Sequence, residues 1–208
     1  MPDTYLTVAA EGAHETEVNR SRFLCVLAPA ATEEAALARV ARARERHPAA
    51  SHHCFAYVIG SDADVRRASD DGEPSGTAGQ PMLNMLLRRE ARFAVAVVTR
   101  WFGGTKLGAG GLIRAYGGAV GAALDAHPLV PRRRLRLATV TVDHARAGRL
   151  ENEVRALGHP VRDVAYGSEV TLTLALPAAE LDGFAAWLAS ATAGAARLTP
   201  GGETHDAA

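Results

Sequence analysis

The sequence predicts an α+β fold organised as two domains, and three observations support this. Helix-like and strand-like periodic segments stop at Leu124 and resume only after the prolines Pro128 and Pro131. Exposed connectors that contain proline are typical of domain boundaries. Strands and helices are mixed in the first half, and the second half follows the order β-α-β-β-α-β. We therefore expect a first domain over residues 1–131 and a second over residues 132–208.

The first domain is expected to combine helices and strands around one central strand. Residues 94–102 form this strand, because they are apolar on both faces as far as Val98. Thr32 precedes two glutamates and is the expected N-cap of a helix, and Pro48 lies beyond the end of that helix. The other expected strands are residues 21–27, 53–59 and 64–69, and the other expected helices are residues 82–89 and 112–124.

The second domain is predicted to be ferredoxin-like, because two split βαβ halves of this length form a sandwich of helices on a sheet. Its expected strands are residues 135–142, 161–166, 170–176 and 196–199, and its expected helices are residues 145–157 and 178–190. The apolar residues expected to face the sheet are Leu150, Val154, Leu157, Leu181, Phe184 and Leu188. Residues 200–208 are expected to be disordered.

Composition limits the class of protein. Of the 208 residues, 48% are hydrophobic and 22% are charged, which is ordinary for a chain that buries a core. No signal peptide or membrane-spanning segment is recognisable, so the cytoplasm is the expected location. The formal net charge is zero, so any binding of nucleic acid must depend on local patches. Cys25 and Cys54 lack metal-type spacing, so we expect buried thiols, no metal and no cofactor.

A glycine-rich, basic segment spans residues 99–119 and is the most informative part of the chain. A buried apolar strand leads into it and a helix leads out of it. In such segments glycines let backbone N–H groups approach an anion closely. Arg114 is expected in the first helical turn, where a cation opposes the helix dipole unless an anion binds. The residues predicted to bind an anion or nucleic acid are Arg100, Trp101, Gly103, Gly104, Lys106, Gly108, Gly110, Gly111 and Arg114.

The same glycines also have a purely structural interpretation. They would then form a tight turn and a close helix crossing, with the Arg114 side chain extending to water. The spacing matches neither a phosphate-binding P-loop nor a dinucleotide fingerprint, because Lys106 precedes the glycine cluster and Ile113 replaces the third glycine. Lys106 is the only lysine in the chain, which favours a specific use of its ammonium group over chance in an arginine-rich composition.

A second candidate site combines an acidic, turn-rich segment at residues 69–81 with a preceding histidine pair. Its carboxylates are suited to Mg²⁺ or proton transfer, and a histidine is suited to acid–base chemistry. The alternative is that the carboxylates form turns, with one histidine in the core and one at the surface. Ser75 lacks the spacing of a nucleophile elbow. The candidate residues are His52, His53, Asp70, Asp71, Glu73, Ser75 and Thr77.

Three motifs together resemble the IMPACT family in its bacterial two-domain form. They are HHCFAY from residue 52, SDDGEPSGTAGQP from residue 69, and RWFGGTKLGAGGLIRAYGGA from residue 100. The resemblance implies that the first domain has the fold of the second domain of a small-subunit ribosomal protein, a fold also found in domain four of elongation factor G. It implies that the second domain is like domain five of that factor. Trp101 stands where this family usually has Tyr or Phe.

The sequence leaves three functions open. The translation-factor-like domains that the resemblance implies favour a protein that binds RNA or the ribosome, with phosphate on the basic loop and a base stacked on Trp101. The second is an enzyme that acts on a phosphorylated substrate through Asp70, Asp71 and Glu73. The third is a non-catalytic module that binds a small anion or a protein, such as a translation-related partner. No membrane association is expected, and the sequence indicates no oligomeric state.

Overall fold

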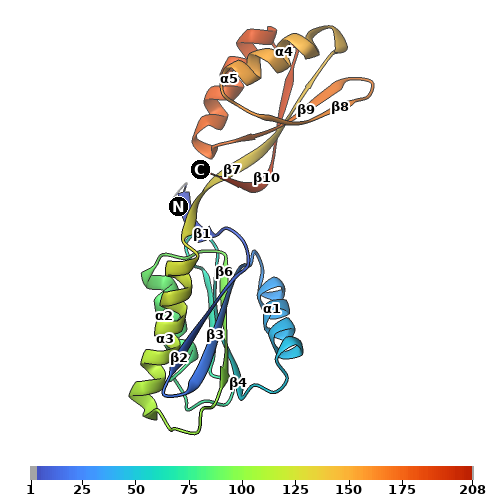
Figure 1. The fold of residues 1–208 in the computed structure, drawn as a ribbon. Helices are drawn as coiled ribbons and strands as arrows, with labels where there is room; N and C mark the ends of the chain where they lie inside the picture. Colours follow the sequence, from blue (N-terminus) through green and yellow to red (C-terminus); the bar gives the residue numbers. More distant parts are fainter. Residues whose placement is uncertain (1–3, 208) are drawn as a thin grey trace. The chain divides into compact units, whose positions relative to one another are not determined.

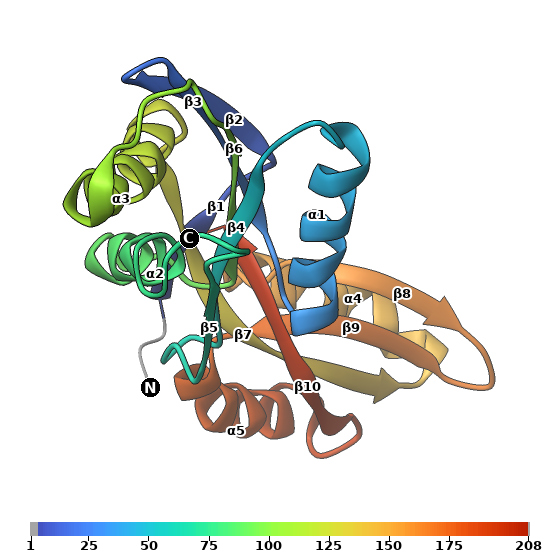
Figure 2. The same ribbon diagram turned by 90° about the horizontal axis from the view of Figure 1, so that it is seen from below.

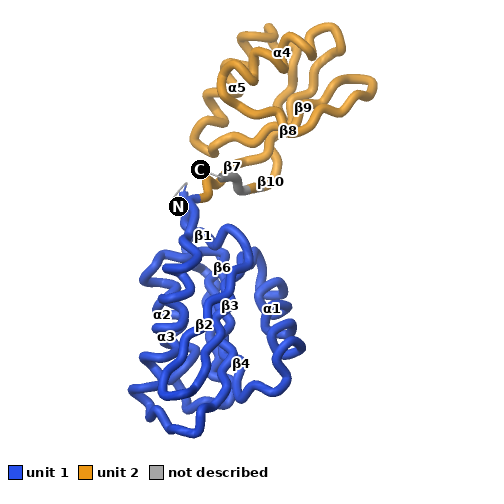
Figure 3. Tube along the Cα trace, in the orientation of Figure 1, with its two compact units in different colours: residues 1–131 blue, residues 132–208 orange. Residues whose placement is uncertain are grey.

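The computed structural model describes residues 4–207, with side chains for all of these except Glu203 and residues 205–207. The chain divides into two compact units between Pro131 and Arg132 (Figure 3). Two antiparallel sheets with packed helices make the fold α+β, as predicted (Figure 1). Within the described residues, no helix is long and apolar enough to cross a membrane.

The sheet of the first unit has β6 (Ala94–Trp101) at its centre. The strand order is β2-β3-β6-β4-β5, and neighbouring strands are antiparallel. The other four strands are β2 (Gly12–Val18), β3 (Ser21–Pro29), β4 (His52–Ile59) and β5 (Val65–Ser69). Every residue of β6 before Trp101 is buried, which confirms the predicted central strand.

Helices cover both faces of this sheet (Figures 1 and 2). They are α2 (Gly79–Arg88) and α3 (Gly108–Ala126) on one face and α1 (Glu33–Arg46) on the other. Because side chains alternate along a strand, Val98 packs with the residues of α2 and α3, whereas Val97 packs with those of α1. Thr32 caps α1 as predicted, since its hydroxyl accepts a hydrogen bond from the Ala35 N–H at 3.2 Å.

The second unit has the predicted β-α-β-β-α-β order; β10 and β9 both pair with β7, and β8 pairs with β9. Its elements are β7 (Leu129–Val142), α4 (His144–Ala156), β8 (Val161–Tyr166), β9 (Val170–Leu176), a 3₁₀ turn (Ala178–Glu180), α5 (Leu181–Thr192) and β10 (Arg197–Ala207). Leu150, Val154, Phe184 and Leu188 are buried against the sheet as predicted. Leu157 is 48% exposed because it caps the end of α4, so its predicted burial is wrong.

The predicted element boundaries fail at both ends of the chain. The strand β1 (Thr4–Val8) and the strand β2 were not predicted. The prediction that residues 200–207 are disordered is also wrong, because β10 continues through them and Ala207 pairs with Arg132 of β7. β7 likewise begins earlier than predicted. Residues 132–134 of β7 pair with residues 205–207 of β10, so over this stretch each strand supplies the hydrogen-bonding partners of the other.

Each unit is expected to fold when it is produced alone. The hydrophobic clusters of the first unit use residues up to Leu129, and the cluster of the second uses residues from Ala138. We expect polypeptides 1–131 and 132–208, expressed separately, each to melt cooperatively when followed by circular dichroism. The full-length chain is the reference, and an unfolded polypeptide of either length would show that the boundary is misplaced.

Candidate functional site

Alternation along β6 separates two residues that the sequence placed in one site. Arg100 lies on the face covered by α2 and α3, and its guanidinium carbon is 5.6 Å from the centre of the Phe102 ring. Trp101 points to the opposite face, where the Arg22 guanidinium lies 4.4 Å from its ring centre and the His47 ring packs edge-on at 5.3 Å. The structure therefore does not place Trp101 on the surface to which Arg100 contributes.

The histidine pair is divided in the same way, because His52 and His53 are consecutive in β4. His52 Nδ1 lies 2.9 Å from the Asp71 carbonyl oxygen, and its Nε2 lies 3.8 Å from Glu73 Oε1. His53 Nδ1 instead lies 3.2 Å from the Thr99 hydroxyl, and burial is the main reason that the pKa of His53 is lowered. Of the two histidines, only His52 approaches the Glu73 carboxylate.

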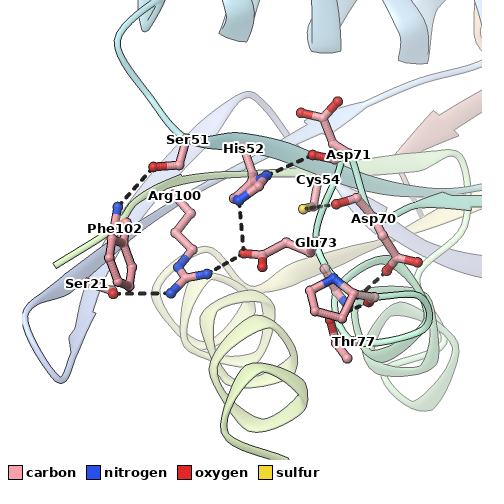
Figure 4. A network of polar contacts seen from close by, with 12 residues as sticks. Ser21, Ser51, His52, Cys54, Asp70, Asp71, Glu73, Thr77, Arg100 and Phe102 are labelled. Atoms are coloured by element: carbon pink, nitrogen blue, oxygen red, sulfur yellow. Dashed lines mark hydrogen bonds and ion pairs between the residues drawn. The ribbon is translucent and has the colours of Figure 1, made fainter. Parts of the chain in front are cut away.

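A buried ion pair joins the basic and acidic segments (Figure 4). Arg100 Nη1 donates to Glu73 Oε1 at 2.5 Å, and the two side chains are 6% and 4% exposed. The Tyr116 hydroxyl of α3 donates to the same oxygen at 2.7 Å, and Arg100 Nη2 lies 3.4 Å from the Ser21 hydroxyl. The Arg100 Nε–H has no acceptor among the residues that the structure describes. Burial, with Cys54 and Glu73 close by, raises the pKa of Tyr116, so this hydroxyl stays a donor.

Asp70 holds the acidic segment in its turn. Its carboxylate accepts hydrogen bonds from the backbone N–H groups of Gly76, Ala78 and Gly79, at 2.8, 3.0 and 2.8 Å. Burial acts to raise the pKa of Asp70, but these three donors outweigh it and hold the pKa below its usual value. The carboxylate is therefore engaged by the backbone of its own loop.

Asp71 fixes the same segment to its neighbours. Its carboxylate accepts a hydrogen bond from the His53 N–H at 2.6 Å and forms an ion pair with Arg44 of α1. Burial acts to raise the pKa of Asp71, but these partners lower it below its usual value. The residue has a φ of 44°, a left-handed conformation that aspartate adopts more readily than most residues.

The remaining candidates of the acidic segment are Thr77, which bonds within the loop, and Ser75, which faces solvent. The Thr77 hydroxyl donates to the Pro74 carbonyl oxygen at 2.6 Å, and Ser75 is exposed. Across the described part of the chain, no three His, Cys, Asp or Glu side chains are grouped so that they could hold a metal ion. Asp70 and Asp71 hold the loop in its conformation. Of the three described carboxylates of this segment, only Glu73 forms an ion pair with Arg100 of the basic segment.

The glycine-rich loop has one position where only glycine fits. A Cβ on Gly103 would lie 2.1 Å from the carbonyl carbon of Arg20, which as a backbone atom cannot turn aside. Gly103 also donates its N–H to the Ser21 hydroxyl at 3.1 Å. Gly104 and Gly108 have φ values of 85° and 69°, which favour glycine. The loop therefore runs close against the turn between β2 and β3 before α3 begins.

The helix α3 begins at Gly108, four residues before the predicted start, and this changes the position of Arg114. Gly110 and Gly111 lie in the first turn, and Arg114 lies in the second, so its predicted place in the first turn is wrong. The helix start was predicted too late because the 3.6-residue apolar period begins only at Leu112, whereas the residues before it are mostly glycine. No side chain caps the amino terminus of α3, so its first N–H groups are not bonded by a capping residue.

A pocket of about 330 Å³ opens where the acidic and basic segments meet, and we call it the α3 pocket. It is lined by Glu73, Pro74, Arg100, Phe102, Lys106, Leu107, Gly108, Ala109 and Leu112. Lys106 is exposed, and in the described part of the chain it forms no ion pair or hydrogen bond. The pocket thus combines an unpaired ammonium group, an uncapped helix terminus and an aromatic ring that is 50% exposed.

A second hollow of similar size in the first unit has different chemistry. It has a volume of about 360 Å³ and includes Leu6, Arg89 and Asp125 in its lining. Arg89 Nη2 lies 2.5 Å from Asp125 Oδ1, so the charges of this hollow neutralise each other. We therefore assign the candidate site to the α3 pocket.

Sequence reasoning identified Arg100, Lys106 and Glu73 but missed other parts of the pocket. Phe102, rather than Trp101, is the exposed aromatic residue at the pocket, and Tyr116 supplies the second donor to Glu73. The alternation of side chains along the strand was the signal that would have assigned the aromatic pair to opposite sides. No sequence signal indicated that Tyr116 points at a carboxylate.

The fold and this site define a two-unit α+β protein whose acidic and basic segments meet at one buried ion pair. The chain belongs to the IMPACT family. Residues 19–124 match the Impact N-terminal domain, and residues 140–195 match a domain of unknown function, DUF1949.

Relatives of similar length are known. The chain is 39% identical over 205 residues to IMPACT family member YvyE of Bacillus subtilis strain 168, covering 99% of this chain and 94% of the relative. It is also 39% identical over 201 residues to IMPACT family member YigZ of Escherichia coli K12, covering 94% and 97%. A crystal structure of a hypothetical protein matches with a TM-score of 0.71 and 37% identity over 95% of this chain and 97% of that one.

A more distant likeness concerns the fold alone. A crystal structure of a protein from Thermus thermophilus matches with a TM-score of 0.50 at 12% identity, covering 99% of this chain and 30% of that chain. Both units of this fold therefore have counterparts within a larger protein.

Asp70 should make the stability of the first unit depend on acid pH. The folded-state pKa of Asp70 lies below its unfolded value, so its stabilising effect is present above about pH 4 and is lost as the pH falls through the folded pKa. Asp70→Asn is expected to lower the free energy of unfolding at pH 7 by about 1 kcal/mol, because one charge-assisted acceptor is lost. The difference should shrink below about pH 4.

The measurement for Asp70 is thermal melting of both proteins between about pH 3 and pH 7. Asp62→Asn is a suitable control, because no hydrogen bond or ion pair of the described residues involves Asp62. A destabilisation by Asp70→Asn that is the same at every pH would contradict this assignment.

Proposed function

We propose that this protein binds RNA, alone or in the ribosome, through a backbone phosphate held in the α3 pocket. The observation that carries the proposal is the uncapped amino terminus of α3, which opens on a pocket with an unpaired lysine. Helix amino termini present free N–H groups and a partial positive charge, which suits a phosphate. Lys106, which also lines the α3 pocket, adds a full positive charge.

The charges of the pocket support an anion at its mouth. The negative charge of Glu73 is compensated by Arg100, so the ammonium group of Lys106 is the uncompensated charge. An unsatisfied buried donor costs about 1–3 kcal/mol, and the Arg100 guanidinium still has its Nε–H without an acceptor in the described structure. Among the described residues that line the pocket, the Arg100 Nε–H therefore lacks an acceptor and the Lys106 ammonium group lacks a counter-charge.

The choice of RNA over other anions has two supports. Phe102 is 50% exposed in the lining of the pocket, and exposed aromatic rings provide stacking surfaces for unpaired bases. We also infer that the first unit resembles a ribosomal-protein domain and that the second is ferredoxin-like, like the paired domains of elongation factor G. Fold alone does not fix function, so the site carries the proposal. The zero net charge implies modest affinity that depends on this pocket.

Replacement of Lys106 tests the phosphate contact. Lys106→Ala is expected to weaken binding of single-stranded oligoribonucleotides to a similar extent for every sequence. It should also lower the slope of log K against log salt by about one unit, because one phosphate contact is lost. Fluorescence anisotropy titrations at several salt concentrations measure both quantities.

Arg42→Ala is the matched control for Lys106→Ala. It removes the same charge from an exposed position of α1, on the other face of the sheet. Affinity and salt slope should change little. An equal effect of the two variants would show that only general electrostatics is involved, and unchanged binding by a folded Lys106→Ala protein would remove the α3 pocket as the RNA site.

The two neighbouring aromatic residues should behave differently. Phe102→Ala is expected to weaken RNA binding by about 1–3 kcal/mol with little change in salt slope, as expected for a lost stacking contact. Trp101→Ala should leave affinity nearly unchanged but lower the melting temperature, because Trp101 packs between Arg22 and His47 on the opposite face. Anisotropy and thermal melting of both variants distinguish these effects. A larger loss of affinity for Trp101→Ala than for Phe102→Ala would contradict the placement of the site.

A further inference from the structure

We propose, on the basis of the proposed function, that Glu73 makes the α3 pocket selective for ribose over deoxyribose by accepting a hydrogen bond from a ribose 2′-hydroxyl. The phosphate of the same nucleotide binds at Lys106 and the amino terminus of α3. The ligand class is thus a phosphate ester that carries a neighbouring hydroxyl donor.

The carboxylate of Glu73 has one occupied oxygen and one free oxygen. Arg100 and Tyr116 both donate to Oε1, and His52 Nε2 lies nearest to that same oxygen. Among the described residues, no hydrogen bond or ion pair reaches Oε2, and Figure 4 shows this second oxygen without a dashed line. Glu73 is 4% exposed at its side chain and lines the pocket, so Oε2 is an acceptor held ready for a bound molecule.

The orientation of this acceptor is fixed by its neighbours. Arg100 comes from β6, Tyr116 comes from α3, and Asp70 holds the loop that carries Glu73 through three backbone hydrogen bonds. A carboxylate held from two sides does not need to reorient when a ligand arrives. Preorganised groups of this kind favour a ligand that matches their geometry over one that does not.

An ionised carboxylate only accepts hydrogen bonds, so the ligand group beside it must be a donor. A second phosphate would be repelled there, whereas the phosphate itself is suited to Lys106 and the N–H groups of α3. In nucleic acids, the 2′-hydroxyl is the donor that lies next to the phosphate and that DNA lacks. Cationic donors and one anionic acceptor in a single pocket of about 330 Å³ therefore match a ribonucleotide.

The test changes the ligand rather than the protein. Wild-type protein is titrated with a single-stranded oligoribonucleotide and with the same sequence carrying 2′-fluoro groups, which keep an RNA-like sugar but cannot donate a hydrogen bond. We expect the fluorinated strand to bind about tenfold more weakly at equal salt, because one hydrogen bond to a charged acceptor is lost. Equal affinity of the two strands would overturn the inference.

Glu73→Gln tests the residue itself. The side chain keeps its shape but presents a neutral amide, so the preference for ribose is expected to fall below about threefold. Thermal melting checks that this variant is folded, since it also weakens the pair with Arg100. A folded Glu73→Gln protein that retains the full preference would assign the selectivity to another residue and overturn the inference.

The outcomes separate this inference from the proposed function. RNA binding that depends on Lys106 but ignores the 2′-fluoro substitution leaves the proposed function standing and removes only the role of Glu73. Absence of RNA binding by wild-type protein overturns the proposed function, and the inference falls with it if ribonucleoside monophosphates do not bind either. If the oligonucleotide does not bind but those monophosphates do, loss of affinity on 2′-fluorination leaves the inference standing for free ribonucleotides, and unchanged affinity overturns it.

Discussion

The ion pair between Arg100 and Glu73 is the interaction on which the site depends. It connects the central strand to the acidic loop, and Tyr116 and Ser21 extend it to α3 and β3. Removing one partner of a buried ion pair costs about 3–5 kcal/mol, because the other charge is left without compensation. The pair therefore requires the acidic and basic segments of the sequence to meet, and the α3 pocket forms where they do.

The three carboxylates of the acidic loop have different tasks because their surroundings differ. Asp70 is held by backbone N–H groups and Asp71 by His53 and Arg44, so both serve to shape the loop. Only Glu73 extends into the pocket. The three carboxylates therefore do not form one cluster, and Glu73 is the one of them that lines the α3 pocket.

Much of the fold could be predicted from the sequence, because it follows from local periodicity. The apolar run of β6, the Thr32 cap of α1 and the element order of the second unit each have a local signal. The late part of β10 has none, since its polar residues are ordered only by pairing with β7. The candidate site was predictable as a set of residue types, but the contact of Tyr116 with Glu73 depends on tertiary packing. Because side chains alternate along a strand, Arg100 and Trp101 could have been assigned to opposite faces of β6 from the sequence. They were assigned to one site because they are adjacent in one motif.

If the α3 pocket binds an anion as proposed, a carboxylate inside it is unfavourable for affinity but favourable for selectivity. Glu73 lowers the attraction of the pocket for any polyanion, and its pairing with Arg100 leaves Lys106 as the only uncompensated cation in the lining. Discrimination between ligands depends on the difference between their binding free energies, and a repulsive or unsatisfied group against the wrong ligand increases that difference. A chain with zero net charge gains little from long-range attraction, so selectivity must come from such short-range contacts. A lining that contains one free carboxylate oxygen and one unpaired ammonium group would therefore suit the proposed ligand, which carries both an anion and a donor.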